Sequence, residues 1–314
     1  MKRKPSSPMA PTFMVSAPGK AIVFGEHAAV YGKPAIAAAI SLRSYLLVTT
    51  LSKSRRTVRL NFRDIGLNHT WEIDTLPWNV FHQPSKKRFY HSVVDSLDSQ
   101  FLEAIMPHAE AVSKHLPEKQ RKIHIKSATA FLYLFLSLGS STSPGFIYTL
   151  RSTIPIGAGL GSSANNTVSA GGTAVMFQRN VSGPPSVIRL TNFPRLPLLL
   201  VDTQQPRSTA VQVEKVKTLK TNYPEITEMI LDGIGKLATS ALELISSADF
   251  PGSDTSDALG RLGILLASTT ERIRELVDYA QIGWTKLTGA GGGGCAITLF
   301  RPDIEAHIIE ELER

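Results

Sequence analysis

Residues 155–163 place three glycines at every second position, in the order Pro-Ile-Gly-Ala-Gly-Leu-Gly-Ser-Ser. Because glycine has no Cβ, the main-chain N–H groups of this segment can close around an anion. Ser162 and Ser163 follow at once and offer hydroxyls to a phosphate oxygen or to Mg²⁺. The composition indicates a phosphate-binding loop, although a plain tight turn can have the same pattern, so the rest of the chain must decide between the two.

The residues after this loop are poor material for the helix that such a loop normally needs. A phosphate-binding loop usually leads into a helix N-terminus, whose free N–H groups and dipole favour the anion. Residues 164–172 read Ala-Asn-Asn-Thr-Val-Ser-Ala-Gly-Gly, a string of poor helix formers, and residues 173–177 predict a strand. The sequence therefore predicts a phosphate loop whose expected helix is missing.

Length and composition limit the remaining choices. A chain of 314 residues predicts about two domains, and its single cysteine, Cys295, excludes an internal disulfide and favours the cytoplasm. The net charge of +8 suits an anionic substrate, but the basic residues are dispersed and form no recognised nucleic-acid-binding module. No segment reaches the roughly 18 apolar residues of a membrane helix. We therefore expect neither nucleic acid nor a membrane as a partner.

A second group of chemistry-bearing residues lies near the N-terminus. Apolar runs on both sides of Pro18-Gly19 predict two short strands joined by a turn. Lys20, Glu26 and His27 stand at the ends of the second strand, where their side chains can point into a cleft. A hairpin with surface charges is the alternative interpretation. Three ionisable groups around one short apolar strand favour a site.

The segments between these two regions alternate little between strand and helix. Residues 45–48, 58–62 and 146–150 predict strands, and residues 89–115 and 127–138 predict helices from their apolar spacing. Strands followed by helices, without a regular alternation, favour an α+β fold over a doubly wound sheet.

The C-terminal part begins with a predicted buried strand over residues 196–201, and helical spacing returns over 209–247 and 258–280. Thr203 lies at the strand-to-helix junction, where its hydroxyl could meet a ligand, although a helix N-cap explains it equally well. Residues 289–294 match the pattern G-x-G-x-x-G, yet a strand and not a helix follows, which excludes a dinucleotide fingerprint. So many glycines favour close backbone approach to a ligand or to the first loop.

Three ordered motifs resemble those of the GHMP small-molecule kinases: Ser16 to Lys20 with Gly25-Glu26-His27, Pro155 to Ala164, and Lys286 to Ala296. In detail each is most similar to the mevalonate kinase branch, of a fungal type. The resemblance implies a two-domain α+β fold, with ATP and mevalonate in a cleft between the domains. It implies an ATP-binding domain over 12–192 and a ferredoxin-like α+β domain over 193–314. Residues 1–11 contain three prolines and little else that could pack, which predicts a disordered tail.

The resemblance also implies roles for individual residues. Lys20 matches the active-site lysine, which helps acidify the substrate hydroxyl and offsets phosphate charge, and Ser163 matches a catalytic residue that also ligates Mg²⁺. Positions that line the mevalonate pocket match Glu26, His27 and Thr203. Positions that contact the nucleotide match Lys20, Asp64, Ser152, Gly157, Ala158, Gly159, Leu160, Gly161, Ser162, Ser163, Gly291 and Gly292.

One departure from the family pattern coincides with the missing helix. In the family, several dozen residues follow the phosphate loop before the segment that begins here at Asn166. The absent part holds a glutamate that ligates Mg²⁺ and the catalytic aspartate, and the join places Asn165 where that aspartate would stand. An amide cannot accept a proton as a carboxylate does. A second shortening is predicted near residues 260–270. The fold is therefore expected to be incomplete in this chain.

These motifs imply ATP- and Mg²⁺-dependent phosphorylation of the 5-hydroxyl of mevalonate in isoprenoid and sterol biosynthesis, with impaired catalysis. A working kinase remains open if Lys20 or another group replaces the aspartate. The alternatives are a non-catalytic nucleotide-binding homologue and a defective splice or gene-model product. Another GHMP substrate, such as phosphomevalonate or homoserine, is a weaker alternative. A homodimer is kept as a candidate assembly.

Overall fold

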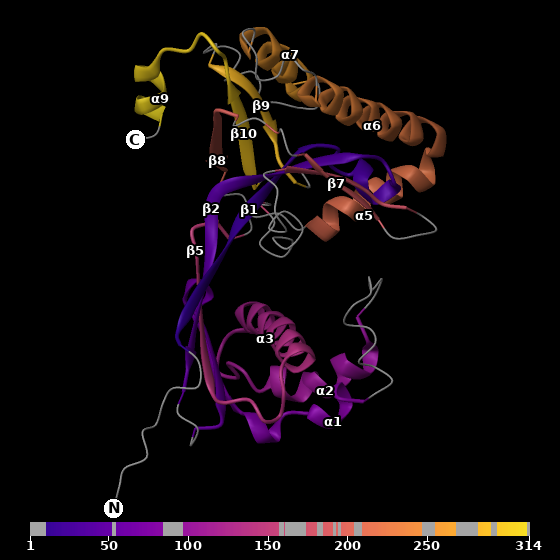
Figure 1. Ribbon diagram of the computed structural model, residues 1–314. Helices are drawn as coiled ribbons and strands as arrows, with labels where there is room; N and C mark the ends of the chain where they lie inside the picture. Colours follow the sequence, from indigo (N-terminus) through magenta and orange to yellow (C-terminus); the bar gives the residue numbers. More distant parts are fainter. Residues whose placement is uncertain are drawn as a thin grey trace, which may run out of the picture. The chain divides into compact units, whose positions relative to one another are not determined.

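A computed structural model of the chain resolves two compact units (Figure 1). Unit 1 consists of residues 1–16 and 44–152, and unit 2 consists of residues 17–43 and 153–314. The predicted disordered tail lies outside the described residues except for Pro11, and the predicted domain boundary at residue 193 stays a prediction. The structure describes residues 11–51, 55–83, 97–156, 160, 174–180, 185–190, 193, 196–203, 209–246, 255–267, 282–289 and 294–312.

Unit 1 contains a mixed group of strands. Strand β3 (Thr57–Phe62) pairs antiparallel with β4 (Leu67–Glu72) and parallel with β5 (Phe146–Ser152). Residues 44–50 of the long strand β2 (Ala35–Thr50) pair antiparallel with β5. Every second residue of β3 faces the core, which is why its sequence alternates between apolar and polar side chains. The predicted strands over 45–48, 58–62 and 146–150 are confirmed.

Three helices accompany these strands: α1 (Trp78–Phe81), α2 (Ser99–Glu110) and α3 (Glu118–Leu138). Helix α2 begins where the carboxylate of Asp98 accepts hydrogen bonds from the N–H groups of Gln100 and Phe101. The core of unit 1 is rich in aromatic side chains, and the rings of Phe81 and Phe101 stack with centroids 4.0 Å apart. Of the two helices predicted here, α3 starts well before residue 127, and α2 ends at Glu110.

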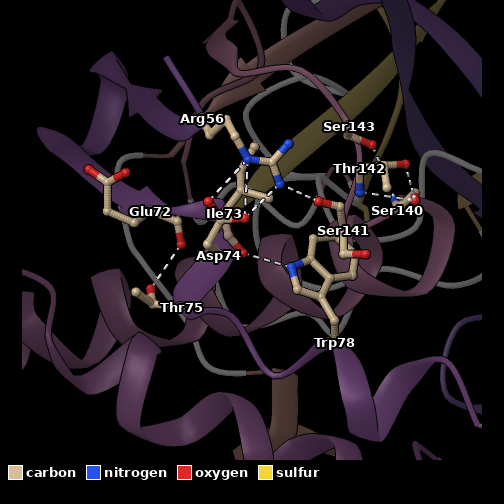
Figure 2. Close-up of polar contacts among 10 residues, drawn as sticks. All are labelled: Arg56, Glu72, Ile73, Asp74, Thr75, Trp78, Ser140, Ser141, Thr142 and Ser143. Carbon is tan, nitrogen blue, oxygen red and sulfur yellow. Dashed lines mark hydrogen bonds and ion pairs between the residues drawn. The ribbon is translucent and has the colours of Figure 1, made fainter. Parts of the chain in front are cut away.

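A polar cluster fixes the turn that leads from β4 into α1 (Figure 2). It includes the 3₁₀ helix η3 (Ile73–Thr75), and a further 3₁₀ helix, η2 (Arg63–Ile65), lies between β3 and β4. The Arg56 guanidinium donates to both carboxylate oxygens of Asp74 and to the carbonyl of Ser141. The indole N–H of Trp78 donates to the Ile73 carbonyl at 2.7 Å. These bonds connect two loops that are about 85 residues apart in the sequence.

Strand β1 (Phe13–Phe24) begins in unit 1 and continues through Lys20 into unit 2, so the predicted turn at Pro18-Gly19 is wrong. In the described part of the chain β1 pairs with β2 alone, and an edge strand tolerates a proline. A Cβ on Gly19 would come within 2.9 Å of Ile40 and 3.0 Å of Ile154. Gly19 is therefore explained by close packing and not by a turn.

The remaining strands of unit 2 form two groups. Residues 35–38 of β2 pair with β6 (Ala174–Gln178), which pairs with β7 (Ser186–Leu190). A separate antiparallel sheet has the order β8 (Leu198–Asp202), β10 (Cys295–Phe300), β9 (Gly283–Leu287). The strands predicted at 173–177, at 196–201 and after residue 294 are confirmed.

Helices and one 3₁₀ helix complete unit 2. Helix α7 packs against β9 so closely that a Cβ on Gly263 would meet the Trp284 ring at 2.1 Å (Figure 1). The predicted helical region 209–247 is confirmed, and it is divided before Pro224. Together the units confirm an α+β fold. The helices and the 3₁₀ helix are η1 (Ala28–Tyr31), α5 (Thr209–Asn222), α6 (Pro224–Ser246), α7 (Thr255–Ala267) and α9 (Ala306–Leu312).

Among the helices that the structure describes, none is both long enough and apolar enough to cross a membrane.

Candidate active site

The turn after β1 holds Glu26 and His27 in a tight backbone conformation. Gly25 has φ of 91°, and a Cβ at this position would lie 2.5 Å from the Pro34 carbonyl oxygen. His27 has φ of 59°, which is uncommon for a residue with a side chain and is found mostly where surrounding structure enforces it. The Gly25 carbonyl accepts a hydrogen bond from the Ala29 N–H at 3.1 Å, which closes the turn. The Glu26 side chain is left only 12% exposed.

Lys20 lies in the middle of β1 and next to the predicted phosphate loop. Its backbone N–H donates to the carbonyl of Leu160 at 3.0 Å, and the Leu160 side chain is buried. Burial lowers the pKa of the Lys20 ammonium, and the negative charge of Glu26 partly opposes that shift. The structure thus brings Lys20 together with Leu160 and within electrostatic reach of Glu26.

Lys286 is the principal residue of this site that the sequence analysis did not single out. Its side chain is 2% exposed, and its ammonium donates to the Val23 carbonyl at 2.8 Å and to Oε1 of Glu26. Burial lowers the pKa of Lys286, while the adjacent carboxylate of Glu26 acts to raise it. A lysine in a strand with apolar neighbours on both sides, Trp284 and Leu287 among them, was the available signal, because such a charge is buried only with a partner.

Thr288 provides a second contact between the third motif and β1. Its hydroxyl accepts a hydrogen bond from the Ile22 N–H and donates to the Ile22 carbonyl, both at 3.2 Å. The expectation that the glycine-rich segment after Lys286 approaches a ligand or the loop at residues 155–163 stays a prediction, because residues 290–293 lie outside the described residues. The residues that lead into this segment contact the strand of the first motif.

Thr203 lies just after β8 and contacts the end of the same glycine-rich segment. Its N–H and its hydroxyl both donate to the Gly294 carbonyl, at 2.9 Å and 2.7 Å. The contact fixes Gly294, whose φ of 85° favours glycine, at the start of β10. The hydroxyl therefore has a structural role here, and its predicted contact with substrate stays a prediction.

Asp64 and Ser152 lie together in unit 1. The Asp64 carboxylate accepts a hydrogen bond from the Ser152 N–H at 2.7 Å, and its other oxygen lies 3.5 Å from Nε of Arg151. The Ser152 hydroxyl lies 2.9 Å from the hydroxyl of Ser44. This arrangement explains why Asp64 stands in the turn η2, where its side chain can reach the end of β5.

The remaining predicted ligands fall outside the described residues. These are residues 157–159, 161–163, 291 and 292, together with Asn165 at the predicted join. Among the residues that can be described, no group of three or more His, Cys, Asp or Glu could hold a metal ion. A lysine ammonium is a group that can offset phosphate charge, so Lys20 is compatible with a nucleotide phosphate, and the predicted contact of Ser163 with a metal stays a prediction.

Comparisons with known proteins agree with the resemblance to the GHMP kinases. The family model described as "GHMP kinases N terminal domain" matches residues 123–188, and "GHMP kinases C terminal" matches residues 254–314. Mevalonate kinase erg12 of Aspergillus fumigatus is 56% identical over all of this chain and 71% of its own length. Mevalonate kinase ERG12 of Gibberella zeae is 50% identical, over 100% of this chain and 75% of its own.

Solved structures share the fold. The Methanococcus jannaschii mevalonate kinase matches with a TM-score of 0.57 and 21% identity, over 98% of this chain and 96% of that chain. A structure described as "L. major mevalonate kinase in complex with R-mevalonate" matches with a TM-score of 0.57 and 17% identity, over 98% of this chain and 94% of that chain. The fold and the site thus define a kinase of the GHMP class. Within that class, the chain belongs to the mevalonate kinase family.

The same comparison measures how much shorter this chain is. The match to the Aspergillus fumigatus relative extends over 380 aligned positions, whereas this chain has 314 residues. At least 66 positions, the difference between 380 and 314, therefore have no residue of this chain. The position of the main gap, between Ala164 and Asn165, stays a prediction.

Proposed function

We propose that this chain binds mevalonate and ATP as a mevalonate kinase does, and that its phosphoryl transfer to the 5-hydroxyl is impaired. The observation that carries the proposal is the meeting of the first and third motifs, in which buried Lys286 is bonded to Val23 and Glu26. Lys20 lies on β1 with Val23, and its backbone N–H donates to the carbonyl of Leu160 in the predicted phosphate loop. Phosphoryl transfer depends mainly on positioning and on compensation of phosphate charge, and this arrangement supports both.

The proposed roles follow from the chemistry of each side chain. The Lys20 ammonium offsets phosphate charge and helps acidify the substrate hydroxyl, and Glu26, His27 and Thr203 line the mevalonate pocket. Asp64 and Ser152 contact the nucleotide, and the loop around Leu160 holds its phosphates. Gly291 and Gly292 border the phosphates. Mg²⁺, with Ser163 as a protein ligand, would neutralise charge on the phosphate oxygens when it is bound.

The impairment follows from what the family places after the phosphate loop. The 66 or more positions without a residue of this chain are enough to hold the aspartate that accepts the hydroxyl proton and the glutamate that ligates Mg²⁺. Asn165 has no basic oxygen of comparable strength. A general base contributes roughly 10²- to 10⁴-fold to the rate, so we expect turnover near background.

The shortening also favours a second candidate function. A chain that keeps the glycine loops but lacks the base could bind nucleotide and act without catalysis, as a partner or regulator. A defective splice or gene-model product has the same sequence signature, and sequencing the transcript across Ala164–Asn165 separates the two. We propose in addition that the chain is located in the cytoplasm and forms a homodimer.

The test is mevalonate-dependent ADP release by the purified chain with Mg²⁺ and ATP, together with calorimetric titration of mevalonate. The decisive variant restores the Aspergillus fumigatus segment between Ala164 and Asn165. Lys20→Met in that restored chain removes the proposed active-site cation, and Lys217→Met, a change in an exposed ion pair of the same unit, is the matched control.

We expect the unmodified chain to bind mevalonate with turnover at least about 100-fold below that of the restored chain. Lys20→Met should abolish the restored turnover, and Lys217→Met should leave it unchanged. Equal turnover in the unmodified and restored chains would show that the aspartate is dispensable. A folded chain that binds ATP but not mevalonate would favour the regulator, and an aggregated chain would favour the defective product.

A further inference from the structure

A buried ion pair joins two segments that are 260 residues apart in the sequence. Lys286 is on β9, directly before the glycine-rich segment of the third motif, and Glu26 is in the turn after β1. Both residues belong to unit 2. The exposed fractions of their side chains are 2% and 12%, so water solvates neither charge well.

The contacts of Lys286 hold its ammonium from two directions. The Val23 carbonyl accepts one N–H at 2.8 Å, and Oε1 of Glu26 accepts another. Because Val23 belongs to β1 and is itself buried, the ammonium has a fixed anchor that does not depend on Glu26. Glu26 stands in the turn after β1, and the described contact of its carboxylate is the ion pair with Lys286.

The second carboxylate oxygen has no such partner in the described part of the chain. Among the described residues, the hydrogen bond to the Glu26 carboxylate is accepted by Oε1, so Oε2 can still accept one. A carboxylate can only accept hydrogen bonds, so the matching group on a small polyol acid such as mevalonate is a hydroxyl and not its carboxylate. The ammonium of Lys20 lies within electrostatic reach of Glu26, and among the described residues no hydrogen bond joins the two side chains.

We propose that Lys286 is a positioning residue that orients Glu26 to receive a substrate hydroxyl. The third motif would thereby act on the substrate pocket through a side chain and not only through its glycines. This inference rests on the proposed function, because it takes Glu26 to face mevalonate. Lys286 itself bonds to protein groups and acts through Glu26.

The test is a double-mutant cycle on mevalonate affinity, measured by calorimetric titration of the full chain. Lys286→Met should weaken mevalonate binding by about 10- to 100-fold, as misplacement of a binding group does. Glu26→Gln should weaken it by a similar factor. The double variant should bind no more weakly than the worse single variant, because both changes remove one interaction.

Two controls separate positioning from general destabilisation. Thr285 is on β9 with Lys286, and Thr285→Val breaks its buried hydroxyl pair with Thr298 of β10 without changing a contact of Glu26. It should lower the melting temperature and leave mevalonate affinity within about twofold. Lys286→Arg keeps a cation and should retain most of the affinity. If Lys286→Met does not fold, Lys286→Gln, which is smaller and can still donate to Val23, replaces it with the same expected loss.

The outcomes distinguish this inference from the proposed function. Loss of affinity in Lys286→Met with no further loss in the double variant supports positioning. A folded Lys286→Met that binds mevalonate normally overturns the inference and leaves the proposed function standing. Additive losses also overturn it, because Lys286 would then contact the substrate directly. An unmodified chain that folds but does not bind mevalonate overturns both.

Discussion

The two compact units each contain a close ion pair, and the surroundings of the two pairs differ. In unit 2 the Lys286–Glu26 pair has side chains that are 2% and 12% exposed. In unit 1 the Arg56–Asp74 pair has better geometry, with both carboxylate oxygens engaged, but its side chains are 35% and 66% exposed (Figure 2). Water can replace either partner of the exposed pair, whereas a buried ion that loses its partner has no substitute. Burial therefore decides which pair the fold depends on.

The largest expected effect is that of Glu26→Gln. Among the described residues it leaves the buried Lys286 ammonium with the Val23 carbonyl and an amide as partners, so the free energy of unfolding should fall by about 3–5 kcal/mol. Urea denaturation followed by tryptophan fluorescence measures the change, with Trp284, which packs against the core of unit 2, as the reporter. If Glu26→Gln and Asp74→Asn have the same free energy of unfolding, the expected difference between the buried and the exposed pair is wrong.

An intermediate effect is expected from His124→Leu, which removes a buried polar side chain that forms no ion pair among the described residues. His124 is fully buried in unit 1, with Nδ1 2.7 Å from the Ser113 hydroxyl and Nε2 2.8 Å from the Ile65 carbonyl. Leucine fills a similar volume but leaves both partners without a hydrogen bond, at a cost of about 1–3 kcal/mol. The same urea experiment measures it. A cost as large as that of Glu26→Gln would mean that the loss of any buried hydrogen-bond partner, and not the loss of an ion pair in particular, sets the size of the effect.

A smaller effect is expected when both charges of the buried pair are removed together. The variant Lys286→Met/Glu26→Gln removes both charges of this pair, so its free energy of unfolding should lie within about 1 kcal/mol of that of the unmodified chain. Comparison with Glu26→Gln in the same urea titration isolates the cost of the unpaired ammonium. If the double variant is no more stable than Glu26→Gln, packing of the lysine stem carries the effect.

The smallest effect is expected at the exposed pair, and it depends on pH. The Arg56 guanidinium lowers the pKa of Asp74 below its usual value of 3.8. The contribution of the pair is therefore fully present above pH 3.8 and is lost as pH falls through the lowered pKa in the folded chain. Asp74→Asn should leave stability at pH 7 almost unchanged and remove this part of the acid dependence. Identical acid titrations of both chains would show that the pair contributes nothing.

Local patterns were enough to predict much of the fold. The strands at 58–62, 146–150 and after residue 294 have β-type alternation or apolar runs bounded by glycine, and the structure confirms them. At Pro18-Gly19 the same reasoning failed, because local turn residues stood in a continuous strand. Only the edge position of β1, with Ile40 and Ile154 packed on Gly19, explains that pair.

The sequence by itself determined the order of the three motifs and the family to which they belong. It also predicts that the catalytic aspartate of the family is missing after the phosphate loop. These features are local, since each depends on residue type and spacing. The tertiary structure decided that Lys286 is bonded to Glu26 and that Thr288 is bonded to Ile22. Contacts between residues more than 250 positions apart depend on how β9 packs against β1, and no local pattern specifies that packing.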